Sequence, residues 1–83
     1  MRITVRYFAS IREAVGTGSE PWQTAAVDLG GLRDELVLRS PAYAQALARG
    51  RAVRIAMNQI MCQESAALVD GAEVAFFPPV TGG

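Results

Sequence analysis

The C-terminal stretch of the chain places the strongest constraint on its fold. Residues 74–77 form a continuous apolar run, with a turn signal before it and two prolines after it. Such a run is typical of a central β-strand. Because Pro78 and Pro79 have no backbone N–H to donate, strand pairing should stop there. A Pro-Pro pair also favours the extended polyproline II conformation. The sequence therefore predicts a sheet whose central strand is followed directly by a projecting tail.

The tail has the features of a substrate that is handed to other proteins. A diglycine end is the narrowest possible, since no Cβ hinders a partner from enclosing the backbone. Four to six extended residues span roughly 13–20 Å, enough to enter another protein's active site. A terminal carboxylate is ionised at neutral pH and is a poor electrophile, so it must be activated, for example as an acyl-adenylate. We predict a domain over residues 1–78 and a flexible tail over 79–83. The reactive residue is Gly83, and the residues inserted into a partner are Pro79, Val80, Thr81 and Gly82.

Composition limits the classes of partner. Eighty-three residues make one domain, and a hydrophobic content of 51% is that of a folded chain. The formal net charge is zero, and all eight basic residues are arginine. No basic run is present, so no nucleic-acid partner is expected. Without lysine, the side chains cannot accept an isopeptide bond. No leader or long apolar stretch is seen, so we expect a cytoplasmic protein without membrane contact.

The remaining pattern predicts five strands and three helices. Alternating or apolar runs indicate strands, and helical spacing of leucines indicates the longest helix. The predicted strands cover residues 2–8, 20–26, 53–57, 60–62 and 74–77, and the predicted helices cover residues 9–15, 29–39 and 41–49.

Capping residues set the predicted helix ends. Ser10 and Gly16 would begin and end the first helix. Asp28 would cap the longest helix, and Ser40 would cap the third, which Gly50 would end. Two glycines, Gly30 and Gly31, lie in the first turn of the longest helix at a cost of about 1 kcal/mol each relative to alanine. The sequence pattern does not explain them.

This order of elements describes an α+β β-grasp fold. We expect a mixed sheet of about five strands, with one main helix and a short second helix packed on one face. Phe8 shares its strand face with the polar Thr4 and Arg6, so it should lie on the uncovered face. Phe77 would share that face if the first and last strands are neighbours. We predict that Phe8 and Phe77 form a partner-binding patch; the alternative is that loops cover Phe77.

No catalytic or metal-binding constellation is visible. The chain has no histidine, and its single cysteine, Cys62, has no local base. An iron–sulfur β-grasp protein would need four cysteines. The loop at residues 16–19 resembles the start of a dinucleotide fingerprint but lacks its third glycine. We therefore expect no active site of its own, no metal and no bound cofactor.

Three motifs carry a family resemblance that spans the chain. They are residues 5–13 with Gly16, residues 53–59, and the run Leu68-Val-Asp-Gly-Ala-Glu-Val-Ala-Phe-Phe-Pro-Pro-Val-Thr-Gly-Gly83. The chain resembles the MoaD family of sulfur carriers, the small subunit of molybdopterin synthase. One departure is Ala72, where the family usually has an aspartate. This change would affect local stability more than function.

The resemblance implies a pathway for the tail. A MoeB-type enzyme would use ATP to adenylate the Gly83 carboxylate, and a sulfur donor would convert it to a thiocarboxylate. The tail would then enter the large subunit, MoaE, which supplies the catalytic residues. Sulfur would pass to precursor Z to form the dithiolene of molybdopterin, within a heterotetramer. The carrier itself would be a non-catalytic subunit.

Three alternatives stay open from the sequence. The chain could be a thiamine-pathway sulfur carrier of the ThiS type, although these are usually shorter and lack the Phe-Phe-Pro-Pro segment. It could be a ubiquitin-like modifier whose Gly83 is joined to lysines of target proteins. It could also be a β-grasp interaction domain with an incidental tail.

Overall fold

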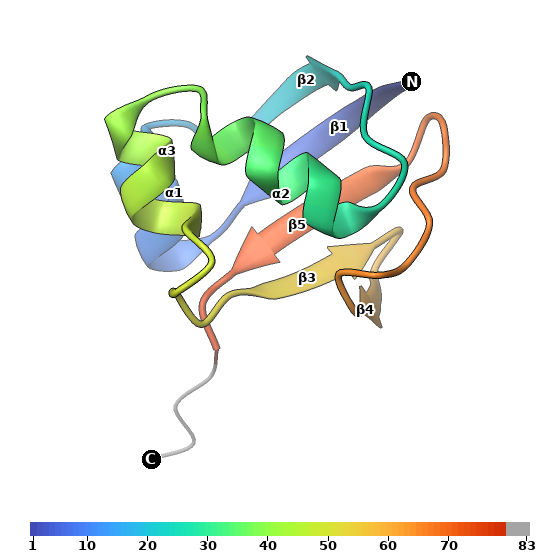
Figure 1. Cartoon of the computed structure of the whole chain (residues 1–83). Helices are drawn as coiled ribbons and strands as arrows, with labels where there is room; N and C mark the ends of the chain where they lie inside the picture. The colour runs from blue at the N-terminus through green and yellow to red at the C-terminus, as the bar shows by residue number, and fades with distance from the viewer. Residues whose placement is uncertain (80–83) are drawn as a thin grey trace.

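The computed structural model describes residues 1–79, and every predicted element is present in it (Figure 1). In chain order, the elements are β1 (Arg2–Tyr7), α1 (Ala9–Val15), β2 (Ser19–Gln23), α2 (Leu29–Val37), α3 (Pro41–Leu47), β3 (Arg54–Met57), β4 (Ile60–Cys62) and β5 (Glu73–Phe77).

The strands form one mixed sheet in the order β2-β1-β5-β3-β4. β1 and β5 are parallel neighbours, with Val5 opposite Val74. The other three pairs are antiparallel. The apolar run of β5 therefore occupies the centre of the sheet, as predicted, and the β-grasp arrangement is confirmed.

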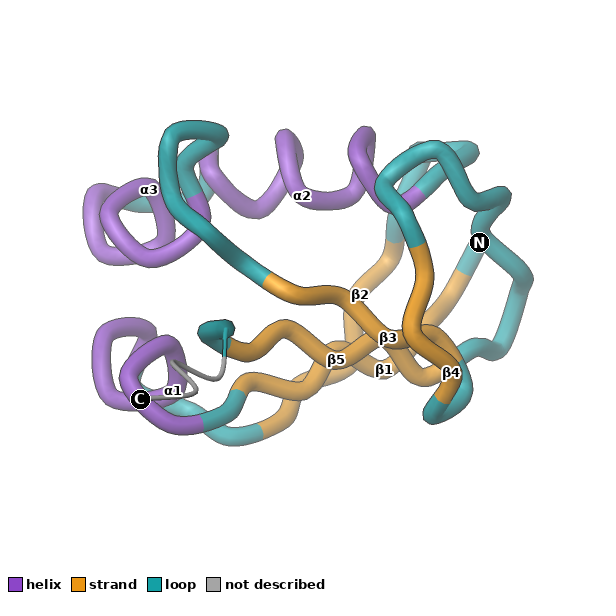
Figure 2. Tube along the Cα trace, turned by 90° about the horizontal axis from the view of Figure 1, so that it is seen from below, coloured by secondary structure: helices purple, strands orange, loops and turns teal. Residues whose placement is uncertain are grey.

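The helices cover one face of this sheet (Figure 2). α2 and α3 lie above the sheet, and α1 lies beside α3 at the end where β1 and β5 finish. The core between these layers takes the inward side chains of the strands, including Val5, Val74 and Phe76, and the leucines of α2. In the part of the chain that the structure describes, no helix is placed over the opposite face (Figure 2), which we call the open face. None of the helices in residues 1–79 is long and apolar enough to cross a membrane.

The first helix begins differently from the prediction. Ser10 is not its cap: Phe8 occupies that position in an extended conformation and makes no side-chain capping bond. The Phe8 N–H donates to the Phe76 carbonyl at 3.1 Å, so sheet pairing continues to this residue and the helix follows at once. Ala9 takes up the change of direction with a φ of 52°. Gly16 ends the helix in the left-handed conformation, as predicted.

Three elements end two or three residues earlier than predicted, and β1 ends one residue earlier, at Tyr7. β2 stops at Gln23, since Glu35 accepts hydrogen bonds from the Thr24 hydroxyl at 2.6 Å and the Ala25 N–H at 3.1 Å. α3 stops at Leu47, so Gly50 is not its terminating residue. α2 itself stops at Val37. The caps predicted at Asp28 and Ser40 are confirmed.

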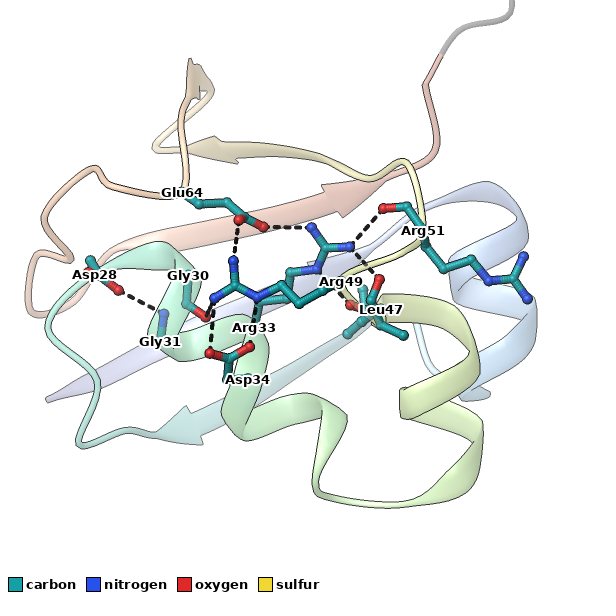
Figure 3. Close-up of polar contacts among 10 residues, drawn as sticks. Asp28, Gly30, Gly31, Arg33, Asp34, Leu47, Arg49, Arg51 and Glu64 are labelled. Carbon is teal, nitrogen blue, oxygen red and sulfur yellow. Dashed lines mark hydrogen bonds and ion pairs between the residues drawn. The ribbon is translucent and has the colours of Figure 1, made fainter.

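A buried arginine fixes the end of α3 (Figure 3). Arg33 is 4% exposed, and its Nε donates to the Leu47 carbonyl at 2.6 Å. Its Nη2 donates to the carbonyls of Ala48 at 2.7 Å and Arg51 at 2.8 Å. Its Nη1 pairs with Glu64 at 2.6 Å. Arg33 thus supplies donors to carbonyls at the C-terminal end of α3, which lack intrahelical partners, and fastens this end to α2.

The two glycines of α2 allow close approach. The Gly30 N–H donates to the Glu64 carbonyl at 2.8 Å. A Cβ at residue 30 would lie 3.4 Å from that carbonyl oxygen and 3.2 Å from Nη2 of Arg49. A Cβ at residue 31 would lie 3.1 Å from the capping oxygen of Asp28. These glycines therefore admit the residue-64 segment and the helix cap, at a local cost in helix propensity.

The turn that contains Ala72 is well held. Ala72 is 1% exposed, and its carbonyl accepts from the Thr4 N–H at 3.0 Å. The neighbouring Asp70 accepts from the Arg2 N–H at 2.9 Å, and Gly71 adopts the φ of 79° that the turn requires. The methyl group of Ala72 fits this buried position. These hydrogen bonds hold the turn without a carboxylate at residue 72.

A second polar cluster joins β1, β2 and α3. Oε2 of Glu20 accepts hydrogen bonds from the hydroxyls of Tyr7 at 2.7 Å and Tyr43 at 2.8 Å. Oε1 pairs with Arg39, whose guanidinium also stacks on the rings of Trp22 and Tyr43. Burial acts to raise the pKa of the Glu20 carboxyl, but the hydrogen bonds from Arg39 and both tyrosines outweigh it and lower the pKa.

This lowered pKa predicts acid sensitivity. The ionised Glu20 stabilises the fold above the pKa of an unfolded glutamate, about 4.3, and this contribution is lost as the pH falls through the lower folded-state value. Glu20→Gln should cost about 1–3 kcal/mol at pH 7, because charge-assisted hydrogen bonds are weakened. Thermal melts of both proteins from pH 7 to pH 3 should show the difference shrinking with acid. A constant difference would contradict this role.

Candidate functional site

The candidate site begins where the central strand leaves the sheet. β5 ends at Phe77, and the following Pro78 and Pro79 are half-buried at the end of the sheet. The predicted tail residues Val80, Thr81, Gly82 and Gly83 lie outside the described residues. The division between a domain ending at residue 78 and a tail is therefore still a prediction.

The two aromatic residues predicted for the open face lie together. The rings of Phe8 and Phe77 meet edge-to-face, with centroids 6.3 Å apart and planes at 86°. Phe8 is 38% exposed and Phe77 is half-buried. The Arg6 guanidinium lies 5.0 Å above the Phe8 ring and 3.6 Å from the Glu73 carboxylate. The structure confirms that the pair is adjacent, while its role in binding a partner is still a prediction.

The apolar surface extends further than the sequence analysis expected. Strand register places Ala75 opposite Ala56, and Ala56 opposite Met61. By alternation from Phe77, all three side chains point to the open face; Met61 is 53% exposed, whereas Ala56 is buried beneath its neighbours at 7% exposed. The alternation within residues 60–62 could have indicated Met61, but only the strand order shows that it continues the same surface. We call Phe8, Ala56, Met61, Ala75 and Phe77 the open-face patch.

A cleft of about 440 Å³ lies beside the start of the tail. Two helices and a connecting segment form its walls, and Pro78 forms part of its edge. It is lined by Ser10, Ile11, Ala14, Gln45, Ala46, Arg51, Ala52, Val53 and Pro78. We call it the tail-base cleft. Sequence reasoning could not find it, because it is assembled from four separate segments.

Cys62 has a structural environment. It is half-buried, lies opposite Ile55 in the sheet and packs against the core. Its thiol donates to the Ile60 carbonyl at 3.3 Å. Within residues 1–79, no group of three histidine, cysteine or acidic side chains is placed to hold a metal ion. The described residues thus present an apolar patch beside the strand that leads to Pro78 and Pro79.

The mixed five-stranded sheet, with its helices on one face and its central strand running parallel to β1, defines a ubiquitin-like β-grasp domain. The model of the ThiS family matches residues 5–83. The chain belongs to the ThiS family.

Two curated relatives carry the same name, molybdopterin synthase sulfur carrier subunit. The one from Escherichia coli is 41% identical over 98% of this chain and 99% of its own length. The one from Mycobacterium tuberculosis is 36% identical over 100% of this chain and 99% of its own length. The resemblance to the MoaD family is thereby confirmed.

Solved structures support the fold. One match is a chain in the complex of subunits 1 and 2 of molybdopterin-converting factor from Helicobacter pylori. Its TM-score is 0.69 at 27% identity, and the match covers 100% of this chain and 100% of that chain. The small archaeal modifier SAMP1 from Haloferax volcanii gives a TM-score of 0.80 at 24% identity, also over 100% of both chains. At that identity the second likeness shows the fold alone.

Proposed function

We propose that this chain is the sulfur carrier of a molybdopterin synthase. One observation carries the proposal: the family match runs through residue 83, so it includes the diglycine end, while relatives of matching length bear that name. The proposal places the carrier in the cytoplasm, with a MoeB-like activating enzyme and a MoaE-like large subunit as its partners.

Activation is required because a carboxylate is a poor electrophile. In the proposed step, an oxygen of the Gly83 carboxylate attacks the α-phosphorus of ATP within the activating enzyme, and pyrophosphate leaves. A nucleophilic sulfur at the oxidation level of sulfide, supplied by the donor, then replaces AMP on the acyl carbon. The product is a Gly83 thiocarboxylate. This chain supplies the unhindered end, and the partner supplies the catalytic groups.

Sulfur transfer depends on a reactivity that the thiocarboxylate has and the carboxylate lacks. A thiocarboxylate presents a soft, nucleophilic sulfur at neutral pH, whereas the original carboxylate does not. In the large subunit this sulfur would attack an electrophilic carbon of precursor Z and displace an oxygen leaving group from that carbon. Water would then hydrolyse the acyl–sulfur bond, which leaves the sulfur on the substrate and returns the Gly83 carboxylate. A dithiolene contains two sulfur atoms, so two carrier turnovers are needed for each product.

The described residues would dock the body while Pro79, Val80, Thr81 and Gly82 pass into the partner. The open-face patch lies at the end of the sheet from which Pro78 and Pro79 leave. A partner that encloses the tail is therefore brought against Phe8 and Phe77. Support for such a partner comes from the Helicobacter pylori structure, which is a complex of two subunits.

Reconstitution tests the proposal. Purified carrier, activating enzyme, ATP, a sulfur source, large subunit and precursor Z are combined, and dithiolene product is measured. The proposal predicts product that depends on both ATP and the carrier. A known synthase small subunit serves as the positive control. If that subunit gives product and this chain does not, the proposal is contradicted. Sulfur transfer to a thiamine precursor instead would favour the ThiS-type alternative.

Phe77→Ala should weaken binding of the large subunit at least tenfold, equivalent to about 1.4 kcal/mol. Aromatic side chains at the centre of an interface commonly contribute this much. The melting temperature should change little, because Phe77 faces away from the core that contains Val74 and Phe76. Calorimetric titration and thermal melts measure the two effects.

A matched control for Phe77 is Leu38→Ala, since Leu38 is an exposed apolar residue outside the open-face patch. This change should leave the affinity within about twofold. Unchanged affinity of Phe77→Ala, together with a large loss of stability, would mean that Phe77 serves the fold rather than the interface.

A further inference from the structure

The tail-base cleft has a chemical character distinct from that of the open-face patch. Its polar side chains are Ser10, Gln45 and Arg51, which all offer hydrogen-bond donors, and none of its lining residues is acidic. Ser10 comes from α1, Gln45 from α3 and Arg51 from the segment between α3 and β3. Donors from three separate elements therefore converge on one cleft.

The backbone of Arg51 is fixed by a hydrogen bond, while its side chain is available to bind a partner. Its carbonyl accepts from Arg33 at 2.8 Å, which fixes the main chain. Among residues 1–79, its guanidinium makes no ion pair or hydrogen bond, whereas Arg33 and Arg49 pair with Glu64. Figure 3 shows the Arg51 side chain extending away from these residues toward the helix that lines the other wall of the cleft. The backbone of Arg51 is therefore held in place, and its guanidinium can bind a group that enters the cleft.

The position of the cleft makes it part of any surface that receives the tail. Pro78 lines the cleft and is followed immediately by the segment that the partner must enclose. A partner close enough to hold residue 79 also covers the mouth of the cleft. Covering a guanidinium, an amide and a hydroxyl without acceptors is unfavourable, because buried polar groups must be paired.

We propose that the tail-base cleft binds an acidic side chain of the large subunit. A carboxylate fits the donor set, since it accepts from several donors and pairs with a guanidinium in two-point geometry. This inference rests on the proposed function and deepens it: the open-face patch provides apolar contact, and the cleft provides the charged contact that sets the orientation of the tail.

Charge reversal at Arg51 tests the proposal against a matched control. Arg51→Glu and Arg2→Glu change the net charge equally. Because β1 and β5 are parallel, Arg2 lies at the opposite end of that strand pair from Phe77. Arg51→Glu should weaken binding of the purified large subunit at least tenfold, about 1.4 kcal/mol, while Arg2→Glu should change it less than twofold. Both residues are exposed, so both variants should have the same melting temperature as the wild type.

Salt dependence and a conservative variant identify the nature of the contact. The affinity of the wild type should fall with added sodium chloride more steeply than that of Arg51→Gln, because one ion pair is missing in the variant. Arg51→Lys should recover part of the affinity. Equal losses in Arg51→Glu and Arg2→Glu would overturn the proposal, as would an effect confined to the activating enzyme or to self-association of the carrier.

Failure of the proposed function would give a different result. In that case the wild-type carrier itself would not bind the large subunit at any salt concentration. Normal wild-type binding with no specific effect of Arg51 would overturn the cleft proposal alone.

Discussion

Removal of Gly83 is expected to abolish sulfur transfer. The proposed chemistry takes place on the carboxyl group of this residue, and shortening the tail by one residue withdraws the reactive group by about 3.5 Å. In a site that needs near-attack geometry, such a displacement is decisive. Extension of the chain by one residue past Gly83 should have the same result. The measurement is dithiolene formation in the reconstituted synthase.

The fold should be unaffected by this deletion. The hydrophobic core runs from Ile3 to Phe76, and the central strand ends at Phe77. Circular dichroism spectra and thermal melts of the deletion and the wild type should therefore superimpose. Full transfer activity in a folded chain that lacks Gly83 would contradict the carrier mechanism.

Arg33→Met is expected to produce the largest loss of stability. The substitution removes the side-chain donors to the carbonyls of Leu47, Ala48 and Arg51. The Ala48 carbonyl keeps the Arg51 N–H, and Glu64 keeps only its pair with Arg49. Each buried acceptor that loses its donor costs about 1–3 kcal/mol, so several such losses are a large part of the total of about 5–15 kcal/mol for a small domain. A melting-temperature loss of more than about 10 °C is expected.

Arg49→Met provides the control for Arg33. Arg49 pairs with Asp34 and with the same Glu64, but its side chain is 53% exposed. Exposed ion pairs contribute about 0–1 kcal/mol, so this variant should melt within a few degrees of the wild type. Equal destabilisation by the two substitutions would show that burial of Arg33 is not what matters.

The Arg33 contacts connect the fold to the site. The same guanidinium that fastens the end of α3 also fixes the carbonyl of Arg51, whose side chain lines the tail-base cleft. A variant that loosens this connection should therefore affect both stability and partner binding, whereas Phe77→Ala should affect binding alone.

The sequence was sufficient for the elements whose signals are local. The apolar run at residues 74–77 and the prolines after it identified the central strand, and Asp28 and Ser40 identified two helix starts. The errors have non-local causes. Ser10 is displaced as a cap because Phe8 still pairs with Phe76. The end of α3 is bound by Arg33, which precedes Leu47 by 14 positions.

The candidate site was likewise predictable only where its signals are local in the sequence. Alternation alone placed Phe8 and Phe77 on one face, since each strand has a fixed period of two. Met61 joined them only when the strand order was known, and the tail-base cleft appeared only when α1, α3 and the segment before β3 were brought together. Gly30 had no local explanation because the atoms that approach it come from Arg49 and Glu64. Gly31 is approached by Asp28 and Ala26, whose position against the helix only the structure shows.

The most direct test of the sulfur-carrier proposal is an intact-mass measurement after incubation with the activating enzyme, ATP and a sulfur source. The proposal predicts a mass increase equal to the replacement of one oxygen by sulfur, and fragmentation should locate it at Gly83. Omission of ATP should leave the mass unchanged. A chain that stays a carboxylate under conditions that convert a known carrier, or that takes up sulfur at Cys62 instead, would contradict the central claim.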